Sequence, residues 1–355
     1  MPDTPPLLEV EGLRTWFPIR SGLFQRPSRW VRAVDGVDLL LRDGETLALV
    51  GESGCGKTTV GRSILRLEEP REGSVRVDGV DLLGLDAAAL HPYRRSLQII
   101  FQDPMASLDP RMRVVDAVCE GMRSFGIGDG DAWREKRAEF LLERVRLDVR
   151  LLWRYPHELS GGQRQRVCIA RALALEPRMI VCDEAVSALD VSIQAQILNL
   201  LADLQREDGL AYLFITHDLG VVRHIADRVA VMYLGQIVET APTEELFANP
   251  RHPYTQGLLA AVPSLDPKRR ARGVPVLGDV PSPSSPPAGC RFHTRCSEVF
   301  ARCSQEAPQL KGAGESQLRC FLQDAPPAGR SGGEGPPVSP AHGDEKAAGP
   351  APQRS

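Results

Sequence analysis

The chain has 355 residues, of which 42% are hydrophobic, so it can form one large domain or two smaller ones with buried cores. Its formal charge of −3 and pI near 6.2 exclude a general electrostatic attraction to nucleic acids or anionic lipid. Residues 1–6 lack the pattern of a secretory signal, and no uncharged apolar run approaches the roughly 18 residues of a membrane-spanning helix. We therefore expect a cytosolic protein whose eight cysteines are thiols or metal ligands.

Two kinds of apolar run predict the strands. Runs that partly alternate in polarity are typical of half-buried antiparallel strands. These lie at 7–10, 37–41 and 74–77. Continuous apolar runs are typical of parallel strands buried on both faces. These lie at 46–50, 179–182 and 212–215. Because helical patterns separate the runs, the sequence predicts an α/β core with an antiparallel β subdomain.

A glycine-rich segment joins the strand at 46–50 to a helix-like run at 59–67. Its glycines let the backbone curl so that amide groups point inward, and the positive end of the next helix adds to that field. Lys57 can then reach the outer phosphates of a nucleotide, and Thr58 can offer its hydroxyl to Mg²⁺. The predicted phosphate-binding residues are Gly51, Ser53, Gly54, Cys55, Gly56, Lys57, Thr58 and Thr59.

The pattern becomes helical between 102 and 160. Asp131 is placed to cap a helix whose apolar residues repeat on one face. Those residues are Ala138, Leu141, Leu142 and Val145. We interpret this region, at about 103–160, as a helical subdomain inserted into the core.

An acidic pair follows the strand at 179–182. Asp183 can hold Mg²⁺ directly or through water, and Glu184 can polarise or deprotonate a water in line with the γ-phosphate. Such a pair can also be only a loop start or a helix cap. That reading leaves the phosphate-binding segment unexplained.

Three further features narrow the choice of family. Gln102 follows an apolar run at 97–101, Leu159-Ser160-Gly161-Gly162-Gln163 precedes a helix, and His217 follows the strand at 212–215. Together with Ser187-Ala188-Leu189-Asp190, these motifs occur in one characteristic order. In that order they resemble the ATP-binding subunit of an ABC transporter, a P-loop NTPase. One departure is Ala185, where many such ATPases carry proline.

The resemblance assigns roles to these positions. Glu184, His217 and Gln102 would be catalytic, with His217 at the γ-phosphate and Gln102 touching Mg²⁺ and water beside Asp183 and Thr58. The signature motif at the start of a helix would contact the nucleotide bound by a partner cassette. Asp190 would lie at the contact between the two cassettes. The signature residues are Ser160, Gly161, Gly162 and Gln163.

The resemblance also implies that adenine stacks on an aromatic residue of the first strand. Aligning Leu13-Arg14-Thr15-Trp16-Phe17 with the family selects Phe17 for stacking. Trp16 is adjacent, and the basic insert from 18 to 32 leaves the register open, so either ring can also belong to the core. No Asn-Lys-x-Asp motif is present, which argues against a guanine-specific GTPase.

The C-terminal half points to a transporter class. His252-Pro253-Tyr254-Thr255 and the segment 287–296 resemble the extension on ATPases of bacterial oligopeptide and dipeptide importers. The segments 16–18, 101–104 and 110–112 resemble the F-type member of the paired ATPases. The resemblance implies ATP and Mg²⁺ as cofactors and a peripheral place at the cytoplasmic face of the cell membrane. It implies as partners two permeases, a D-type ATPase or a second copy, and an extracytoplasmic solute-binding protein, with no nucleic acid.

Four cysteines cluster near the end of the chain: Cys290, Cys296, Cys303 and Cys320. Their spacing does not match common zinc ribbons, yet four thiolates can hold a 4Fe-4S cluster or zinc. Some importer ATPases of this type are understood to bind such a cluster, which makes it the preferred hypothesis. Free thiols in a loop-rich extension are the alternative, and His293 is a further candidate ligand.

These patterns predict three regions: an ABC cassette at 7–245, a C-terminal extension at 246–324 and a disordered tail at 325–355, where large apolar residues are nearly absent. An importer ATPase for nickel or another solute is an alternative function. A soluble ABC ATPase acting on DNA or ribosomes is a third, although the coiled coils or second cassette typical of those proteins are not seen.

Overall fold

The computed structural model describes residues 5–21, 26–187, 189–261, 276 and 278–324. Contacts group residues up to Phe321 into one unit and those from Leu322 onward into another. The predicted disordered tail lies outside the described residues. No helix in the described ranges is both long and apolar enough to cross a bilayer.

The first sheet is antiparallel and has four strands in the order β2-β1-β4-β5. They are β1 (Leu8–Ser21), β2 (Arg26–Leu41), β4 (Glu72–Val77) and β5 (Val80–Asp81). The predicted antiparallel strands lie within this sheet, but the β1 and β2 hairpin extends well beyond them. The described part of the basic insert at 18–32 forms its outer arms. Sequence alternation misses these arms because bulges shift the register at several points along β1.

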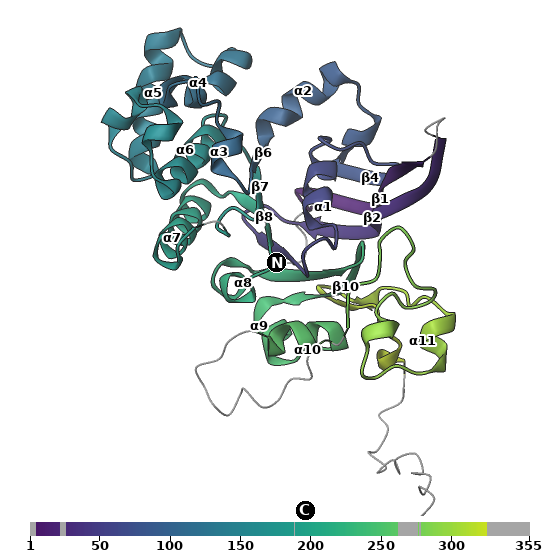
Figure 1. The fold of residues 1–355 in the computed structure, drawn as a ribbon. Helices are drawn as coiled ribbons and strands as arrows, with labels where there is room; N and C mark the ends of the chain where they lie inside the picture. Colours follow the sequence, from purple (N-terminus) through teal and green to yellow (C-terminus); the bar gives the residue numbers. More distant parts are fainter. Residues whose placement is uncertain (1–4, 22–25, 188, 262–275, 277, 325–355) are drawn as a thin grey trace, which may run out of the picture. The chain divides into compact units, whose positions relative to one another are not determined.

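The second sheet has eight strands in the order β11-β12-β10-β9-β3-β8-β7-β6 (Figure 1). Strands β9, β3, β8, β7 and β6 are parallel, and β10, β12 and β11 continue the sheet in antiparallel fashion. The strands are β3 (Thr46–Val50), β6 (Leu97–Ile100), β7 (Met179–Asp183), β8 (Ala211–Thr216), β9 (Arg228–Tyr233), β10 (Gln236–Pro242), β11 (Lys311–Ala313) and β12 (Ser316–Leu318).

The parallel strands are buried on both faces, as their continuous apolar runs predict. In β7, Ile180 and Cys182 pack into one core, whereas Met179 and Val181 pack into the core on the opposite face. The second of these cores joins the two sheets through α1 (Lys57–Ile64). Because side chains alternate along a strand, two-sided burial requires apolar residues at every position.

Four helices gather beside the sheet in the upper left of Figure 1. They are α3 (Pro104–Ser107), α4 (Val114–Ser124), α5 (Asp131–Arg144) and α6 (Gly161–Leu173). The predicted apolar stripe of α5 is fully buried, but the predicted cap is wrong by one residue. Gly130 occupies the cap position, and the Asp131 carboxylate instead accepts hydrogen bonds from Arg123 and Arg134.

Six further helices belong to the described part of the chain. They are α2 (Ala87–Ser96), α7 (Val191–Asp208), α8 (Leu219–Ile225), α9 (Thr243–Ala248), α10 (Pro253–Ala260) and α11 (Ala301–Gln305). Helix α7 packs on the face of the larger sheet formed by β7 and β8. Short 3-10 turns complete the chain: η1 (Leu82–Gly84), η2 (Val149–Trp153), η3 (Pro156–Glu158), η4 (His293–Arg295) and η5 (Phe321–Gln323). Through β12, the C-terminal region adds directly to the edge of β10.

Candidate functional site

Four parallel strands of the larger sheet end at the same edge, and the predicted site residues follow these ends. The phosphate loop at 51–56 follows β3, Asp183 ends β7, His217 follows β8, and Gln102 comes shortly after β6. Parallel α/β sheets bind ligands at this carboxyl edge. The topology therefore brings together residues that are far apart in the sequence.

The phosphate loop is tightly packed against β9 and β2. A Cβ on Gly51 would lie 2.2 Å from the Met232 carbonyl oxygen, and one on Gly56 would lie 2.0 Å from the Ala33 carbonyl oxygen. Gly56 also has a φ of 110°, which side chains with a Cβ rarely adopt. Helix α1 begins at the next residue, so its N-terminal amides point into the loop.

The Lys57 ammonium group is buried and folded back onto the loop. Its Nζ donates hydrogen bonds to the carbonyl oxygens of Gly51 at 2.8 Å and of Glu52 at 3.0 Å. The thiol of Cys55 lies 3.8 Å away, and burial raises the pKa of that thiol. Phosphate oxygens are better acceptors than carbonyls, so a nucleotide can take over these bonds.

The predicted Mg²⁺ ligands Thr58 and Asp183 lie side by side. The Thr58 hydroxyl donates to Asp183 Oδ1 at 2.8 Å, and burial raises the pKa of the Asp183 carboxyl group. A hydroxyl and a carboxylate in contact are the hard oxygen ligands that Mg²⁺ prefers. This pair therefore fits the predicted metal.

The three predicted catalytic residues meet at one carboxylate. The Gln102 side-chain amide donates to Glu184 Oε2 at 2.8 Å, and His217 Nδ1 lies 3.2 Å from Glu184 Oε1. The Glu184 backbone is held in the left-handed region, with φ of 47°, while its amide donates to the Ile215 carbonyl of β8. Two polar side chains thus contact one carboxylate, which directly follows the predicted Mg²⁺ ligand Asp183 in the sequence.

The signature residues start helix α6. Ser160 and Gln163 form a reciprocal capping box, in which the Ser160 hydroxyl accepts from the Gln163 amide at 3.3 Å and Gln163 Oε1 accepts from the Ser160 amide at 2.9 Å. A Cβ on Gly162 would lie 2.6 Å from the Ile193 side chain of α7, which favours glycine there. Gly161 is the first residue of the helix, and Ser160 is exposed.

Comparison with known proteins decides the family. Residues 34–187 match the ABC transporter family model, and residues 238–303 match the model of the oligopeptide/dipeptide transporter C-terminal region. The chain is 52% identical, over 86% of each sequence, to "Probable peptide ABC transporter ATP-binding protein y4tS" of Sinorhizobium fredii. This chain belongs to the ABC transporter ATP-binding proteins. The family resemblance and the fold class inferred from its motifs are thereby confirmed.

Two further relatives extend the comparison. The chain is 59% identical over 278 residues to the glutathione import ATP-binding protein GsiA of Salmonella paratyphi A, but it spans only 44% of that protein's length. A solved dimer of the ATP-binding cassette MJ0796, described as a post-hydrolysis state bound to ADP and Pi, superposes with a TM-score of 0.59 at 29% identity. That match covers 66% of this chain and 98% of the other. This chain therefore carries an ABC transporter ATP-binding cassette.

The two aromatic candidates of this ABC cassette differ in their surroundings. The Trp16 indole donates to Asp35 at 3.2 Å, and the guanidinium groups of Arg32 and Arg71 lie 5.0 and 4.8 Å from its ring centre. Phe17, by contrast, is 36% exposed. Phe17 is therefore the more exposed of the two rings, and its stacking on adenine stays a prediction.

Asp190 stands at the start of α7. It is the N-terminal flanking residue of that helix and is exposed, with its carbonyl accepting from the Gln194 amide at 2.8 Å. Its side chain makes no capping bond. The predicted contact with a second ABC cassette remains a prediction.

The cysteine group of the C-terminal extension does not form a metal site among the described residues, where no three Cys, His, Asp or Glu side chains are arranged to hold an ion. The Cys290 amide donates to the Cys303 carbonyl at 2.8 Å, and burial raises the pKa of the Cys290 and Cys296 thiols. His293 Nδ1 instead contacts the Cys290 carbonyl oxygen at 2.8 Å. The predicted iron-sulfur cluster therefore has no support in this geometry.

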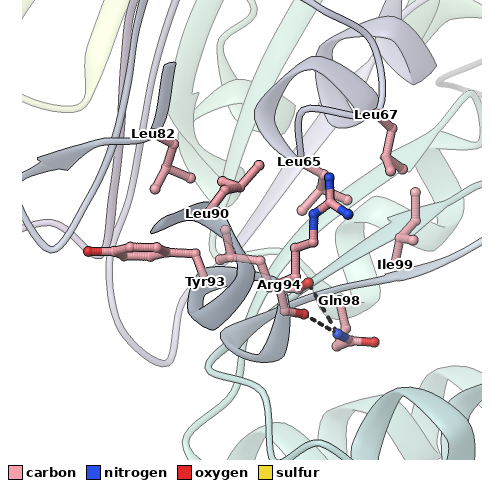
Figure 2. Close-up of a pocket in the computed structure, with 9 residues that line it drawn as sticks. Leu65, Leu67, Leu82, Leu90, Tyr93, Arg94, Gln98 and Ile99 are labelled. Atoms are coloured by element: carbon pink, nitrogen blue, oxygen red, sulfur yellow. Dashed lines mark hydrogen bonds between the residues drawn. The ribbon is translucent and has the colours of Figure 1, made fainter. Parts of the chain in front are cut away.

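A cavity of about 160 Å³ lies elsewhere on the cassette (Figure 2). None of the predicted nucleotide-site residues lines it. Figure 2 shows the Gln98 amide on its wall, bonded to the carbonyl oxygens of Arg94 and Leu97. The lining is mainly apolar: Leu65, Leu67, Leu82, Leu90, Tyr93, Arg94, Leu97, Gln98 and Ile99. Its chemistry does not suit a nucleotide.

Sequence reasoning missed residues of the extension that contact the phosphate loop. Tyr254 accepts a hydrogen bond from the Glu52 amide, and Arg295 forms two bonds with the Glu52 carboxylate. Arg291 likewise contacts Asp35 of β2. A single sequence carries no signal for these pairs, because their partners lie about 200 or more positions away.

Proposed function

We propose that this chain is the ATP-hydrolysing, energy-coupling subunit of an importer for oligopeptides or dipeptides. The observation that carries the proposal is the convergence of Gln102 and His217 on Glu184, next to the bonded pair Thr58 and Asp183. The match of 238–303 to the oligopeptide/dipeptide C-terminal region supports the substrate class. Glutathione, itself a small peptide, falls within that class, and GsiA is named for its import. Nickel or another solute remains the alternative.

In this proposal, Mg²⁺ bound with ATP offsets the negative charge of the phosphates. Lys57 and the amides at the start of α1 bind the phosphate oxygens, with Gly51, Ser53, Gly54, Cys55, Gly56 and Thr59 shaping the loop. Thr58 and Asp183 hold the metal, and Phe17 stacks on adenine. Glu184 accepts a proton from the attacking water, while Gln102 and His217 orient its carboxylate.

We further propose that two cassettes close on the nucleotide. The exposed start of α6, carrying Ser160, Gly161, Gly162 and Gln163, would face the γ-phosphate bound by the partner, with Asp190 at the contact. MJ0796, which this chain resembles, is described as a dimer. Hydrolysis would then require two subunits.

The same proposal assigns the assembly. This chain would be the F-type subunit, paired with a D-type ATPase or a second copy, at the cytoplasmic face of the membrane. Two permeases would transmit closure of the cassettes, and an extracytoplasmic solute-binding protein would deliver the peptide. A role on DNA or ribosomes has no contact or charge pattern in its favour, given the formal charge of −3.

The test compares two variants with opposite expected effects. Lys57→Ala should lose ATP binding, because the variant lacks the ammonium group that binds the phosphate oxygens. Glu184→Gln should keep ATP binding but lower kcat by about 10²- to 10⁴-fold, the usual contribution of a general base. ATP affinity and phosphate release would be measured for the assembled transporter. Glu207→Gln, a change at an exposed carboxylate paired with Arg144, is the control.

Unchanged hydrolysis in Glu184→Gln would contradict the catalytic assignment. Unchanged ATP affinity in Lys57→Ala would contradict the nucleotide site itself. The substrate class is tested separately, by peptide uptake into vesicles that contain the two permeases and both ATPases. Uptake of nickel but not of peptides would support the alternative.

A further inference from the structure

The C-terminal extension is hydrogen-bonded to Glu52 of the phosphate loop. Arg295 Nη1 lies 2.6 Å from Glu52 Oε2, and Arg295 Nη2 lies 3.0 Å from Glu52 Oε1. On the other side, the Glu52 amide donates to the Tyr254 hydroxyl at 2.9 Å. Both the side chain and the backbone of this loop residue are thus held from outside the loop.

The geometry of the Arg295 contact is that of a strong, directional interaction. Two parallel bonds join the guanidinium plane to the carboxylate, an arrangement that fixes orientation as well as distance. The side chains of Arg295 and Glu52 are 6% and 27% exposed, so solvent screens this pair less than it screens a surface pair.

Aromatic packing fixes the two partners from the extension. Tyr254 is fully buried, with its ring centre 4.7 Å from that of Tyr233 and 5.4 Å from that of Phe292. Arg295 lies beside the Tyr233 ring, at 5.8 Å, and its Nη1 is 3.5 Å from the Tyr233 hydroxyl. Tyr233 belongs to β9, the neighbour of β3 in the sheet. The extension is therefore packed on the strand beside the one that leads into the phosphate loop.

Glu52 also contacts the phosphate-binding lysine. Its carbonyl oxygen accepts from Lys57 Nζ at 3.0 Å and from the Cys55 amide at 3.3 Å. A shift of Glu52 would therefore move an acceptor of Lys57 and a bond that shapes the loop. Through Glu52, Arg295 and Tyr254 are therefore linked to Lys57.

We propose that Arg295 and Tyr254 are positioning residues of the nucleotide site, and that the C-terminal extension holds the phosphate loop in its phosphate-binding conformation. The effect on ATP binding rests on the proposed function, whereas the effect on the loop conformation does not. Preorganisation of the loop should lower the cost of ordering it around the phosphates. Loss of the contact should therefore weaken ATP binding without removing any group that touches ATP.

The experiment uses the full chain and two separate readouts. The first is hydrogen exchange of the amides at 52–57 without nucleotide, so it does not depend on ATP binding. Arg295→Gln, Glu52→Gln and Tyr254→Phe should each speed this exchange by about tenfold or more, because the loop opens more often. Arg302→Gln is the control, since Arg302 pairs with Glu306 inside the extension.

The second readout is ATP affinity, together with KM and kcat. Arg295→Gln and Glu52→Gln should each weaken ATP binding by roughly tenfold, and the double variant should be no weaker than either. Arg295→Lys should fall between, because lysine keeps the charge but cannot make both bonds. KM should rise more than kcat falls.

Unchanged loop exchange in Arg295→Gln with a native thermal midpoint would overturn the proposal, as would additive losses in the double variant. If Arg295→Gln does not fold, Glu52→Gln alone decides, because its partly exposed side chain can be changed without opening the core. Failure of ATP binding in the unmodified chain would count against the proposed function, whereas the exchange result would stand on its own.

Discussion

At the scale of single residues, the site separates two neighbouring carboxylates by their surroundings. Asp183 is buried against Thr58, and burial raises the pKa of its carboxyl group. A nearby cation has the opposite effect, because it favours the charged carboxylate. Glu184 has a left-handed backbone, a conformation that costs roughly 1 kcal/mol or more without glycine. Such strain is typical of functional positions, and here it falls on the predicted catalytic residue.

The phosphate loop offers a prediction at the same scale. Gly51→Ala should destabilise the protein by about 3 kcal/mol or more, because the new Cβ would lie 2.2 Å from a backbone oxygen of β9. Gly54→Ala should cost only about 1 kcal/mol, because it has a φ of +78° but no atom within 4 Å. Urea unfolding of both variants provides the measurement. Equal losses would mean that close packing is not what requires glycine at position 51.

At the scale of elements, helix α10 begins with a buried neutral histidine. His252 Nδ1 accepts from the Tyr254 amide at 3.0 Å, and the His252 amide donates to Glu239 at 3.0 Å. Burial lowers the pKa of His252 to about 3. The cap therefore works only with the unprotonated ring.

This cap predicts a defined pH dependence. Below its unfolded pKa of about 6.5, the unfolded chain takes up a proton that the folded chain refuses until about pH 3, so stability falls as pH drops through that window. At pH 5 the loss from this group should be about 2 kcal/mol. Asparagine at position 252 keeps a capping acceptor but cannot be protonated. Between pH 7 and pH 5, the free energy of unfolding of His252→Asn should therefore fall by about 2 kcal/mol less than that of the unmodified protein.

Urea unfolding of both proteins at the two pH values checks this. The neighbouring charged groups Glu239, Arg251 and Arg319 are present in both proteins, so their titration largely cancels in the comparison. Identical losses in the two proteins would show that His252 does not control the acid side of the stability curve.

At the scale of the whole molecule, the extension is part of the cassette's own packing. Strand β12 pairs with β10, Arg291 contacts Asp35, and Phe292 packs against Tyr233 and Tyr254. The core at this end of the sheet therefore contains residues from both the cassette and the extension.

Two truncations test this packing. A chain ending at 245 should lose at least about 4 kcal/mol of stability, because Tyr254 and Phe292 alone each bury a large apolar side chain. That is a large part of a typical folding free energy, so soluble yield should also fall. A chain ending at 324 should keep its thermal midpoint, as expected for removal of the predicted disordered tail. Equal midpoints for the two truncations would contradict the shared core.

Much of the site was predictable because its parts are local patterns. The phosphate loop needs glycine within a few residues of a strand and a helix, and β7 must be apolar at every position to be buried on both faces. Two details could not be predicted to the residue. The arms of the β1 and β2 hairpin contain bulges that break the alternation of polarity, and the cap of α5 lies one residue before the expected position. The cysteine spacing was compatible with a cluster, but spacing does not determine where thiols point.

By itself the sequence determined the α/β class, the phosphate loop, the acidic pair and the family, since each depends on residues adjacent in the chain. Only the tertiary structure decided that Gln102, separated from Glu184 by 82 positions, bonds to it, and that Arg295 reaches Glu52 across 243 positions. The physical reason is that such pairs depend on strand order and on how the extension packs. Those are set by the free energy of the whole fold rather than by any local pattern.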